Sequence, residues 1–71
     1  MIKLYSTHCP FCNVVESKLK EKNISFDIID DLNEVLAKAK IYNTDTVPFA
    51  EIDGQYIPGR ELFMKLTQGD L

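Results

Sequence analysis

The alternation of apolar and polar residues near the start of the chain predicts a short strand followed by a helix. Residues 2–5 suit a strand, which ends at the polar segment 6–8. Pro10 suits the first turn of a helix, because the N–H that proline lacks would have no partner there. We expect this helix to stop at Asn23, and Phe11, Val14, Val15 and Leu19 recur at the spacing of one helical face. At the helix start, Phe11 is expected to be an exposed aromatic residue.

The next segment repeats this order of strand and helix. Residues 24–29 are rich in β-branched side chains that alternate with polar ones, which predicts a second strand. Asp30 and Asp31 follow it, and acidic residues are favourable at the start of a helix. The predicted second helix has Lys38 and Lys40 near its end, and we expect it to bury a face formed by Leu32, Val35, Leu36 and Ala39.

The second half of the chain contains the pattern of a β-hairpin. Asp53 and Gly54 are a strong two-residue turn signal between the apolar segments 49–52 and 55–57. Pro48 stands just before the first of these segments, where a residue without an N–H does not interrupt a sheet. We therefore expect two antiparallel strands after a polar loop.

A last helix completes the predicted fold. Apolar residues recur at helical spacing in residues 60–66, and Gly69 suits the end of a helix. In the resulting order, βαβαββα, the first βαβ unit implies parallel strands and the hairpin adds antiparallel ones. The sequence thus predicts an α/β fold, a four-stranded mixed sheet with three helices packed on its faces, in a single domain over residues 1–71.

The composition is that of an ordinary globular domain and favours neither a nucleic-acid nor a membrane role. Of the 71 residues, 45% are hydrophobic, and the formal net charge is −3 with the basic residues scattered, whereas nucleic-acid-binding domains carry a basic patch. The first residues lack the pattern of a secretory leader, and no apolar run approaches membrane-spanning length. We expect a cytoplasmic monomer that binds neither nucleic acid nor membranes.

Cys9 and Cys12 form a Cys-Pro-Phe-Cys motif where the first strand gives way to the first helix. The thiolate is the nucleophile in disulfide exchange, and the unpaired N–H groups at a helix N-terminus favour negative charge on sulfur. Cys12, three residues later, can reach Cys9 across the first turn, and so short a ring makes a readily reduced disulfide. The motif predicts a thiol–disulfide oxidoreductase in which Cys9 attacks a substrate disulfide and Cys12 resolves the mixed disulfide.

Other interpretations of these residues stay open at this point. The cysteines could be incidental buried residues, or metal ligands, as close pairs in a reducing compartment often are. A structural zinc needs four ligands and the chain offers two Cys and one His, so a monomer should hold no metal, and only a bridged dimer could bind zinc or an iron–sulfur cluster. His8 could favour the thiolate when protonated, or could be an exposed loop histidine without a role.

Three motifs resemble the glutaredoxins, a family with the thioredoxin fold, and the likeness extends over essentially the whole chain. Cys9-Pro10-Phe11-Cys12 is close to the family's Cys-Pro-Tyr-Cys, and Thr46-Val47-Pro48 matches its Thr-Val-Pro. Gly59 stands near the position of its Gly-Gly, at the start of the last helix. The resemblance implies a thioredoxin fold and an oxidoreductase that reduces protein or glutathione mixed disulfides, without a tightly bound cofactor.

The resemblance also implies a substrate-binding surface. Pro48 would be a cis-proline that faces the cysteines, and the backbone of Val47 would pair with a bound thiol substrate such as glutathione. Gly59 would leave backbone N–H groups open at a helix start, and Arg60 could attract a substrate carboxylate. The candidate substrate-binding residues are Phe11, Thr46, Val47, Pro48, Gly59, Arg60 and Glu61.

Departures from the family pattern concern the substrate and the electron donor. Pro58 replaces the first glycine of Gly-Gly, and Asp45 stands where the family commonly has a basic residue that holds a glutathione carboxylate. An acidic residue at that position repels a carboxylate. The alternative is therefore a glutaredoxin-like protein that takes electrons from thioredoxin reductase and passes them to ribonucleotide reductase.

Overall fold

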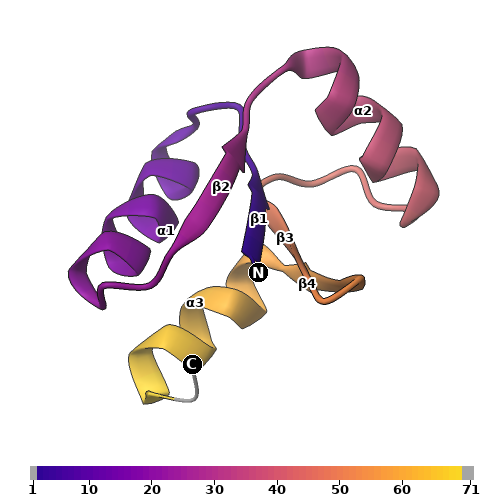
Figure 1. The fold of residues 1–71 in the computed structure, drawn as a ribbon. Coiled ribbons are helices and arrows are strands. Elements are labelled where there is room, and N and C mark those ends of the chain that lie inside the picture. Colours follow the sequence, from indigo (N-terminus) through magenta and orange to yellow (C-terminus); the bar gives the residue numbers. More distant parts are fainter. Residues whose placement is uncertain (1, 70–71) are drawn as a thin grey trace.

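A computed structural model describes residues 2–69 and contains the seven elements in the predicted order (Figure 1). They are β1 (Ile2–Tyr5), α1 (Pro10–Glu21), β2 (Phe26–Ile29), α2 (Leu32–Ile41), β3 (Phe49–Ile52), β4 (Gln55–Pro58) and α3 (Gly59–Gln68). The predicted domain limits, 1 and 71, lie outside the described residues. None of the described helices combines the length and the apolar character needed to cross a membrane.

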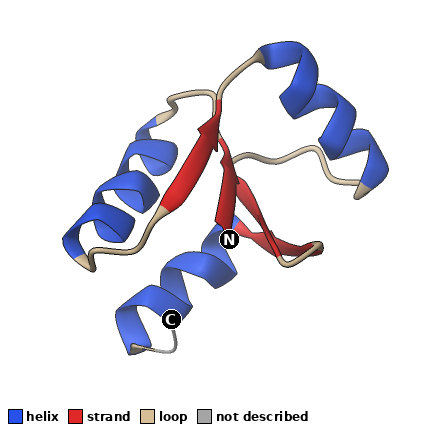
Figure 2. Cartoon of the chain, viewed as in Figure 1, coloured by secondary structure: helices blue, strands red, loops and turns tan. Residues whose placement is uncertain are grey.

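The four strands form one mixed sheet in the order β2-β1-β3-β4 (Figure 2). β1 pairs in parallel with β2 and antiparallel with β3, and β3 pairs antiparallel with β4. Leu4, in the middle of β1, lies between Ile28 of β2 and Ala50 of β3. The mixed sheet predicted from the element order is confirmed, and β1, which leads into the cysteine motif, is one of its two central strands.

The two faces of the sheet carry different cores, because successive strand residues point to opposite faces. One face holds a cluster to which β1, β3, α1 and α3 contribute, with the buried residues Ile2, Leu4, Val15, Leu19, Ala50, Leu62 and Leu66. The other face holds a smaller cluster of Tyr5, Val35 and Phe49, which α2 covers. Figure 1 shows α1 and α3 together and α2 on its own. The cysteine motif therefore begins a helix that packs on the larger core.

In each of the first two helices, an asparagine directly follows the C-cap residue. Asn23 and Asn43 have φ values of 57° and 55°, in the left-handed region. The N–H of Ile24 donates to the Leu19 carbonyl oxygen at 3.0 Å, and that of Thr44 donates to the Ala39 oxygen at 2.9 Å. These bonds close the last helical turn in the manner of a Schellman motif. They confirm the stop at Asn23, and they explain why β2 begins at Phe26, two residues later than predicted.

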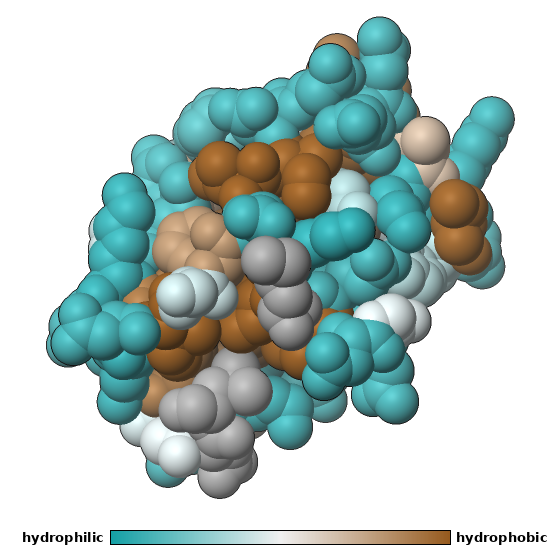
Figure 3. All heavy atoms as spheres, viewed as in Figure 1, coloured by the Kyte–Doolittle hydropathy of each residue, from teal (hydrophilic) through white to brown (hydrophobic). Residues whose placement is uncertain are grey.

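The predicted buried faces of α1 and α2 are wrong in part. On α1, Phe11 is 37% exposed, as expected for an aromatic residue at the helix start, but Val14 is 46% exposed as well, and Cys12 is buried together with Val15 and Leu19. The buried strip of α1, which faces the sheet and α3, is narrower than the helical face on which the apolar residues recur. On α2, Leu32 and Leu36 are exposed and Val35 is buried. Figure 3 shows apolar side chains among the polar ones on one face of the molecule.

α2 is held to the sheet at its C-terminal end by a polar and aromatic network. The Lys38 ammonium donates to Glu51 Oε2 at 2.9 Å, and the Tyr42 hydroxyl donates to the same oxygen. The bond from Tyr42, and then that from Lys38, lowers the pKa of Glu51 below its ordinary value of 4.5. The Tyr42 ring also stacks on Tyr56 of β4, with centroids 5.1 Å apart. The attachment of α2 to the sheet therefore relies on hydrogen bonds and ring stacking, whereas the attachment of α1 relies on apolar packing.

Candidate active site

Cys9 and Cys12 lie at the N-terminus of α1, as the sequence predicted. Cys9 is the N-cap residue, with extended φ and ψ of −69° and 166°, and its sulfur accepts a hydrogen bond from the Cys12 N–H at 3.1 Å. The two sulfurs are joined in a disulfide, with the Cα atoms 4.9 Å apart. The Cys12 side chain is buried, whereas Cys9 is partly exposed. Cys9 is therefore the more accessible of the two cysteines.

This position gives the Cys9 sulfur a defined chemical environment. An N-cap side chain accepts hydrogen bonds from N–H groups that the helix leaves free, and the positive end of the helix dipole lies there. When the disulfide is reduced, the same N–H and dipole favour the thiolate form of Cys9. The described residues of α1 place no acidic side chain in the first turn, where it would oppose that effect.

The Val47–Pro48 peptide bond is cis, as the resemblance implied, and Pro48 is buried. The Gly59 N–H donates to the Pro48 carbonyl oxygen at 3.0 Å. A Cβ added to Gly59 would overlap that oxygen and would lie 2.7 Å from Pro48 Cγ. Only glycine allows this approach, so the start of α3 is fitted directly against the cis-proline.

The expectation that Gly59 leaves its helix start open needs correction. Its own N–H is taken by Pro48, because α3 and the loop before β3 are packed together. The N-cap residue of α3 is Pro58, which makes no side-chain capping bond. The open end of α3 therefore lies one residue later, where Arg60 and Glu61 are both exposed.

Val47 borders an open groove beside α2, and Thr46 precedes it in the same loop. Thr46 is exposed, and its hydroxyl lies 3.2 Å from that of Thr44. Within residues 2–69, the backbone N–H and C=O of Val47 make no hydrogen bond to another residue. The groove has a volume of about 970 Å³, and its lining includes Thr7, Leu32, Leu36, Lys40, Asp45 and Val47. An extended segment could thus bond to Val47 and place apolar side chains against α2.

The remaining predicted substrate residues lie toward α3. Phe11 contacts Phe63 of α3 edge to face, with ring centroids 5.8 Å apart. Arg60 and Glu61 line a second, smaller hollow on α3 together with Met64. The structure thus divides the predicted residues into a group beside the groove and a group along α3.

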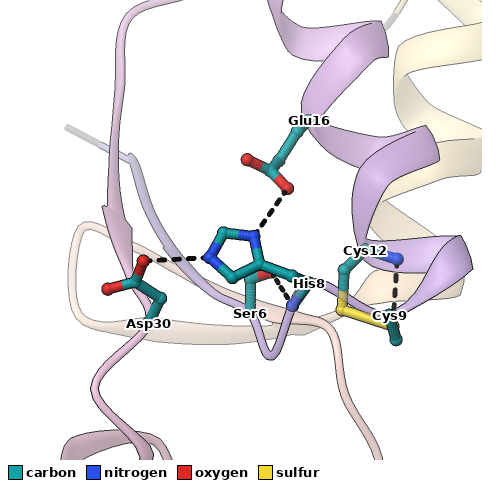
Figure 4. Close-up of polar contacts among 6 residues, drawn as sticks. All are labelled: Ser6, His8, Cys9, Cys12, Glu16 and Asp30. Carbon is teal, nitrogen blue, oxygen red and sulfur yellow. Dashed lines mark hydrogen bonds and ion pairs between the residues drawn. A yellow bond between two sulfur atoms is a disulfide. The ribbon is translucent and has the colours of Figure 1, made fainter.

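His8 makes contacts that the sequence did not reveal. Figure 4 shows its ring turned away from the disulfide, between Asp30 and Glu16. His8 Nε2 lies 2.9 Å from Asp30 Oδ2, and Nδ1 lies 3.9 Å from Glu16 Oε2. The hydrogen bond with His8 is the main cause that lowers the pKa of Asp30. Because Asp30 is 22 residues away, no local pattern could have identified it as the partner.

Ser6, unlike His8, was not singled out from the sequence. It is the one buried polar residue among those described, and its Oγ accepts the His8 N–H at 3.0 Å. Its own N–H donates to the Ile29 carbonyl oxygen at 3.0 Å. Ser6 thereby ties the turn before Cys9 to the end of β2. In the part of the chain that the structure describes, no three His, Cys, Asp or Glu side chains come together to hold a metal ion.

Comparisons with known proteins agree with this arrangement. Residues 2–57 match the model of the glutaredoxin family. A glutaredoxin-like 8.6 kDa protein of Clostridium pasteurianum, described as uncharacterized and in the rubredoxin operon, is 40% identical over 63 residues. The match covers 83% of this chain and 84% of that protein. The crystal structure of a mutant of the thioredoxin-like protein BC3987 superimposes with a TM-score of 0.74 and 26% identity, over 96% of each chain. The thioredoxin fold is confirmed, and the chain belongs to the glutaredoxin family.

Proposed function

We propose that this protein is a dithiol thiol–disulfide oxidoreductase that reduces mixed disulfides through Cys9 and Cys12. The observation that carries the proposal is the asymmetry of the pair at one helix N-terminus. Cys9 is partly exposed and its sulfur accepts the Cys12 N–H, whereas Cys12 is buried directly behind it. Cys9 is therefore suited to attack and Cys12 to resolve.

The reaction proceeds in two exchanges. The Cys9 thiolate attacks one sulfur of a substrate disulfide, forms a mixed disulfide with it, and releases the other sulfur as a thiolate. Cys12 then loses its proton to that leaving thiolate or to solvent and attacks the Cys9 sulfur, which releases the second substrate thiol. The substrate gains two electrons, and the protein is left with the Cys9–Cys12 disulfide that the structure contains.

The loop before β3 would hold the substrate during these exchanges. The backbone of Val47, which has no partner among the described residues, would pair with the backbone beside the substrate sulfur, as an added strand does. Pro48 would fix that loop against Gly59. Phe11 and Thr46 would border the substrate, and Arg60 and Glu61 would contact its polar groups from α3.

Protein disulfides and glutathione mixed disulfides are both candidate substrates, and the donor is either glutathione or thioredoxin reductase. The groove beside Val47 contains Lys40 and Asp45, whose charges oppose each other, and an apolar wall from α2. This lining favours a peptide segment over the two carboxylates of glutathione. Ribonucleotide reductase is one protein that could receive the electrons. Because the pair must be reduced again after each turnover, we place the reaction in a reducing compartment, the cytoplasm.

Two cysteine variants test the assignment of roles. Cys9→Ser should lose at least a hundredfold in the rate of reduction of a mixed disulfide, because the attacking thiolate is gone. Cys12→Ser should still attack and should accumulate a covalent adduct on Cys9, visible by mass spectrometry. Full activity of Cys9→Ser, or an adduct on Cys12 in the wild-type protein, contradicts the proposal.

The electron donor is decided by a direct comparison. The oxidised protein is mixed either with glutathione, glutathione reductase and NADPH, or with thioredoxin reductase and NADPH, and NADPH consumption is followed. We expect faster reduction by thioredoxin reductase, because Asp45 stands beside the groove that would hold glutathione. Replacement by Asp45→Lys should raise the rate with glutathione and leave the other rate unchanged.

A further inference from the structure

The turn that leads into Cys9 is held in an unusual conformation at His8. Its φ is 60°, in the left-handed region that few residues other than glycine adopt, with asparagine, aspartate and histidine the common exceptions. The His8 N–H is bonded to the buried Ser6 hydroxyl. The chain thus enters Cys9 through a residue with a left-handed backbone, whose N–H is held by the buried Ser6.

The His8 ring joins the turn to two other elements. Asp30 follows β2 directly, and Glu16 lies on α1, so the ring connects both to the β1–α1 turn (Figure 4). The Glu16 side chain is only 15% exposed, although His8 and Asp30 are each about half exposed. Asp30 is free for this contact because Asp31, not Asp30, caps α2 by accepting from the Asn33 N–H at 2.9 Å.

Cys9 depends on the turn for its capping geometry. Its sulfur can accept from the Cys12 N–H only while Cys9 keeps the extended backbone that an N-cap residue needs. The Cys9 carbonyl oxygen accepts from the Asn13 N–H at 3.0 Å, which fixes the other side of the residue. His8 precedes Cys9 and sets the direction of the backbone on the N-terminal side of Cys9.

A direct electrostatic role of His8 does not fit this geometry. The ring points away from the sulfurs, and both of its nitrogens face carboxylates whose charge opposes that of an imidazolium. A positive charge compensated in this way contributes little to the stability of a thiolate beyond it.

We propose that His8 is a positioning residue for Cys9: by bridging Asp30 and Glu16, its ring holds the turn that keeps the Cys9 sulfur within reach of the Cys12 N–H. The proposal rests on the function of Cys9 proposed above. It adds Asp30, the residue directly after β2, to the groups that control the reactivity of the cysteine pair.

Asp30→Ala separates positioning from electrostatics, because the two predict opposite results. Removal of a nearby negative charge would by itself make the Cys9 thiolate easier to form. If His8 acts by position, the loss of its anchor instead weakens the capping bond, and the thiolate becomes harder to form. We expect the pH midpoint for alkylation of Cys9 by iodoacetamide, measured on the reduced protein with the site located by mass spectrometry, to move upward by about half a unit to one unit.

Asp27→Ala is the matched control, since Asp27 is an exposed aspartate on β2 and the substitution removes the same charge. It should leave the midpoint unchanged or lower it slightly. A midpoint that falls in Asp30→Ala, or that equals the control value, overturns the proposal. Circular dichroism of each variant confirms that the comparison is made on folded protein.

His8→Asn is a second, independent variant, because asparagine tolerates the left-handed backbone but is too short to bridge both carboxylates. We expect it to raise the alkylation midpoint as Asp30→Ala does, and the double variant to add nothing further. The equilibrium of the pair with a glutathione redox buffer should shift up to tenfold toward the disulfide, or about 30 mV to a lower reduction potential. Additive effects would contradict a shared bridge. The alkylation readout does not require turnover, so it separates a failure of this proposal from a failure of the cysteine roles, which Cys9→Ser tests.

Discussion

α1 and α2 follow the two parallel strands and have similar apolar spacing, but they are attached to the sheet in different ways. α1 buries Cys12, Val15 and Leu19 completely. α2 buries Val35 and leaves Leu32 and Leu36 at 60% and 56% exposed. The same sequence pattern therefore leads to a packed helix in one case and to a helix with a largely exposed apolar side in the other.

The neighbours of each helix explain the difference. α1 shares its face of the sheet with α3, so its side chains meet a second helix as well as the strands. α2 is alone on the other face, where Tyr42 and Lys38 reach Glu51 of β3. The cysteine pair begins the helix with the larger core, and a reactive group needs a support whose own position is fixed by packing.

The largest expected effect is a truncation in the core of α1. Leu19→Ala should lower the free energy of unfolding by about 3 kcal/mol, because it leaves a cavity in the larger cluster. Leu36→Ala, the same change on α2, should alter it by less than about 0.5 kcal/mol, because the side chain is already exposed. Urea unfolding of the oxidised proteins measures both. A cost at Leu36 close to that at Leu19 would mean that α2 is packed against something in solution.

An intermediate effect is expected from Glu51, and it depends on pH. The pKa of Glu51 is lower in the folded protein than its ordinary value of 4.5, so its contribution to stability is present above that pH. The contribution is lost as the pH falls through the lowered value, because the protonated carboxyl no longer holds Lys38. Between about pH 6 and pH 3, the protection of backbone amides from hydrogen exchange, taken relative to the intrinsic exchange rate at each pH, should therefore fall in α2 more than in α1.

Glu51→Gln is the control for this pH dependence. It should speed up exchange in α2 already at neutral pH, and it should remove most of the additional change on acidification. If α1 and α2 respond to acid equally in the wild-type protein, the network at Glu51 is not what anchors α2.

The smallest expected effect is the loss of an ion pair on α1. Lys18 Nζ lies 3.7 Å from Glu21 Oε2, and the Glu21 side chain is 68% exposed. Glu21→Gln should change the free energy of unfolding by less than about 0.5 kcal/mol, because exposed pairs on a helix contribute little. A larger loss in thermal or urea unfolding would show that α1, like α2, is held by charges.

Local signals predicted the elements and the motif well. The turn at Asp53 and Gly54, the stop at Asn23 and the acidic start of α2 all depend on residues a few positions apart, and the structure confirms each of them. The position of Cys9 at a helix start follows in the same way from the proline after it. These features need no distant partner, so the sequence is sufficient to identify them.

The same reasoning failed where a residue's partner lies far along the chain. Leu32 and Leu36 have the spacing of a buried face, but no second helix covers α2 in the described residues. Gly59 was expected to leave backbone N–H groups open at the start of α3, but Pro48 accepts the N–H of Gly59 itself, because the two segments meet in space. Apolar periodicity shows which side chains can be buried together, and only the packed structure shows which of them are.

By itself, the sequence determined the order of strands and helices, the place of Cys9 and Cys12 at the start of α1, and the resemblance to the glutaredoxins. The tertiary structure decided the surroundings of that pair: the contact of Gly59 with Pro48, the groove beside Val47, and the bridge from His8 to Asp30 and Glu16. The physical reason is the distance along the chain over which each kind of interaction acts. Backbone propensities and helix caps act over a few residues, whereas these contacts join segments that come together only when the sheet is formed.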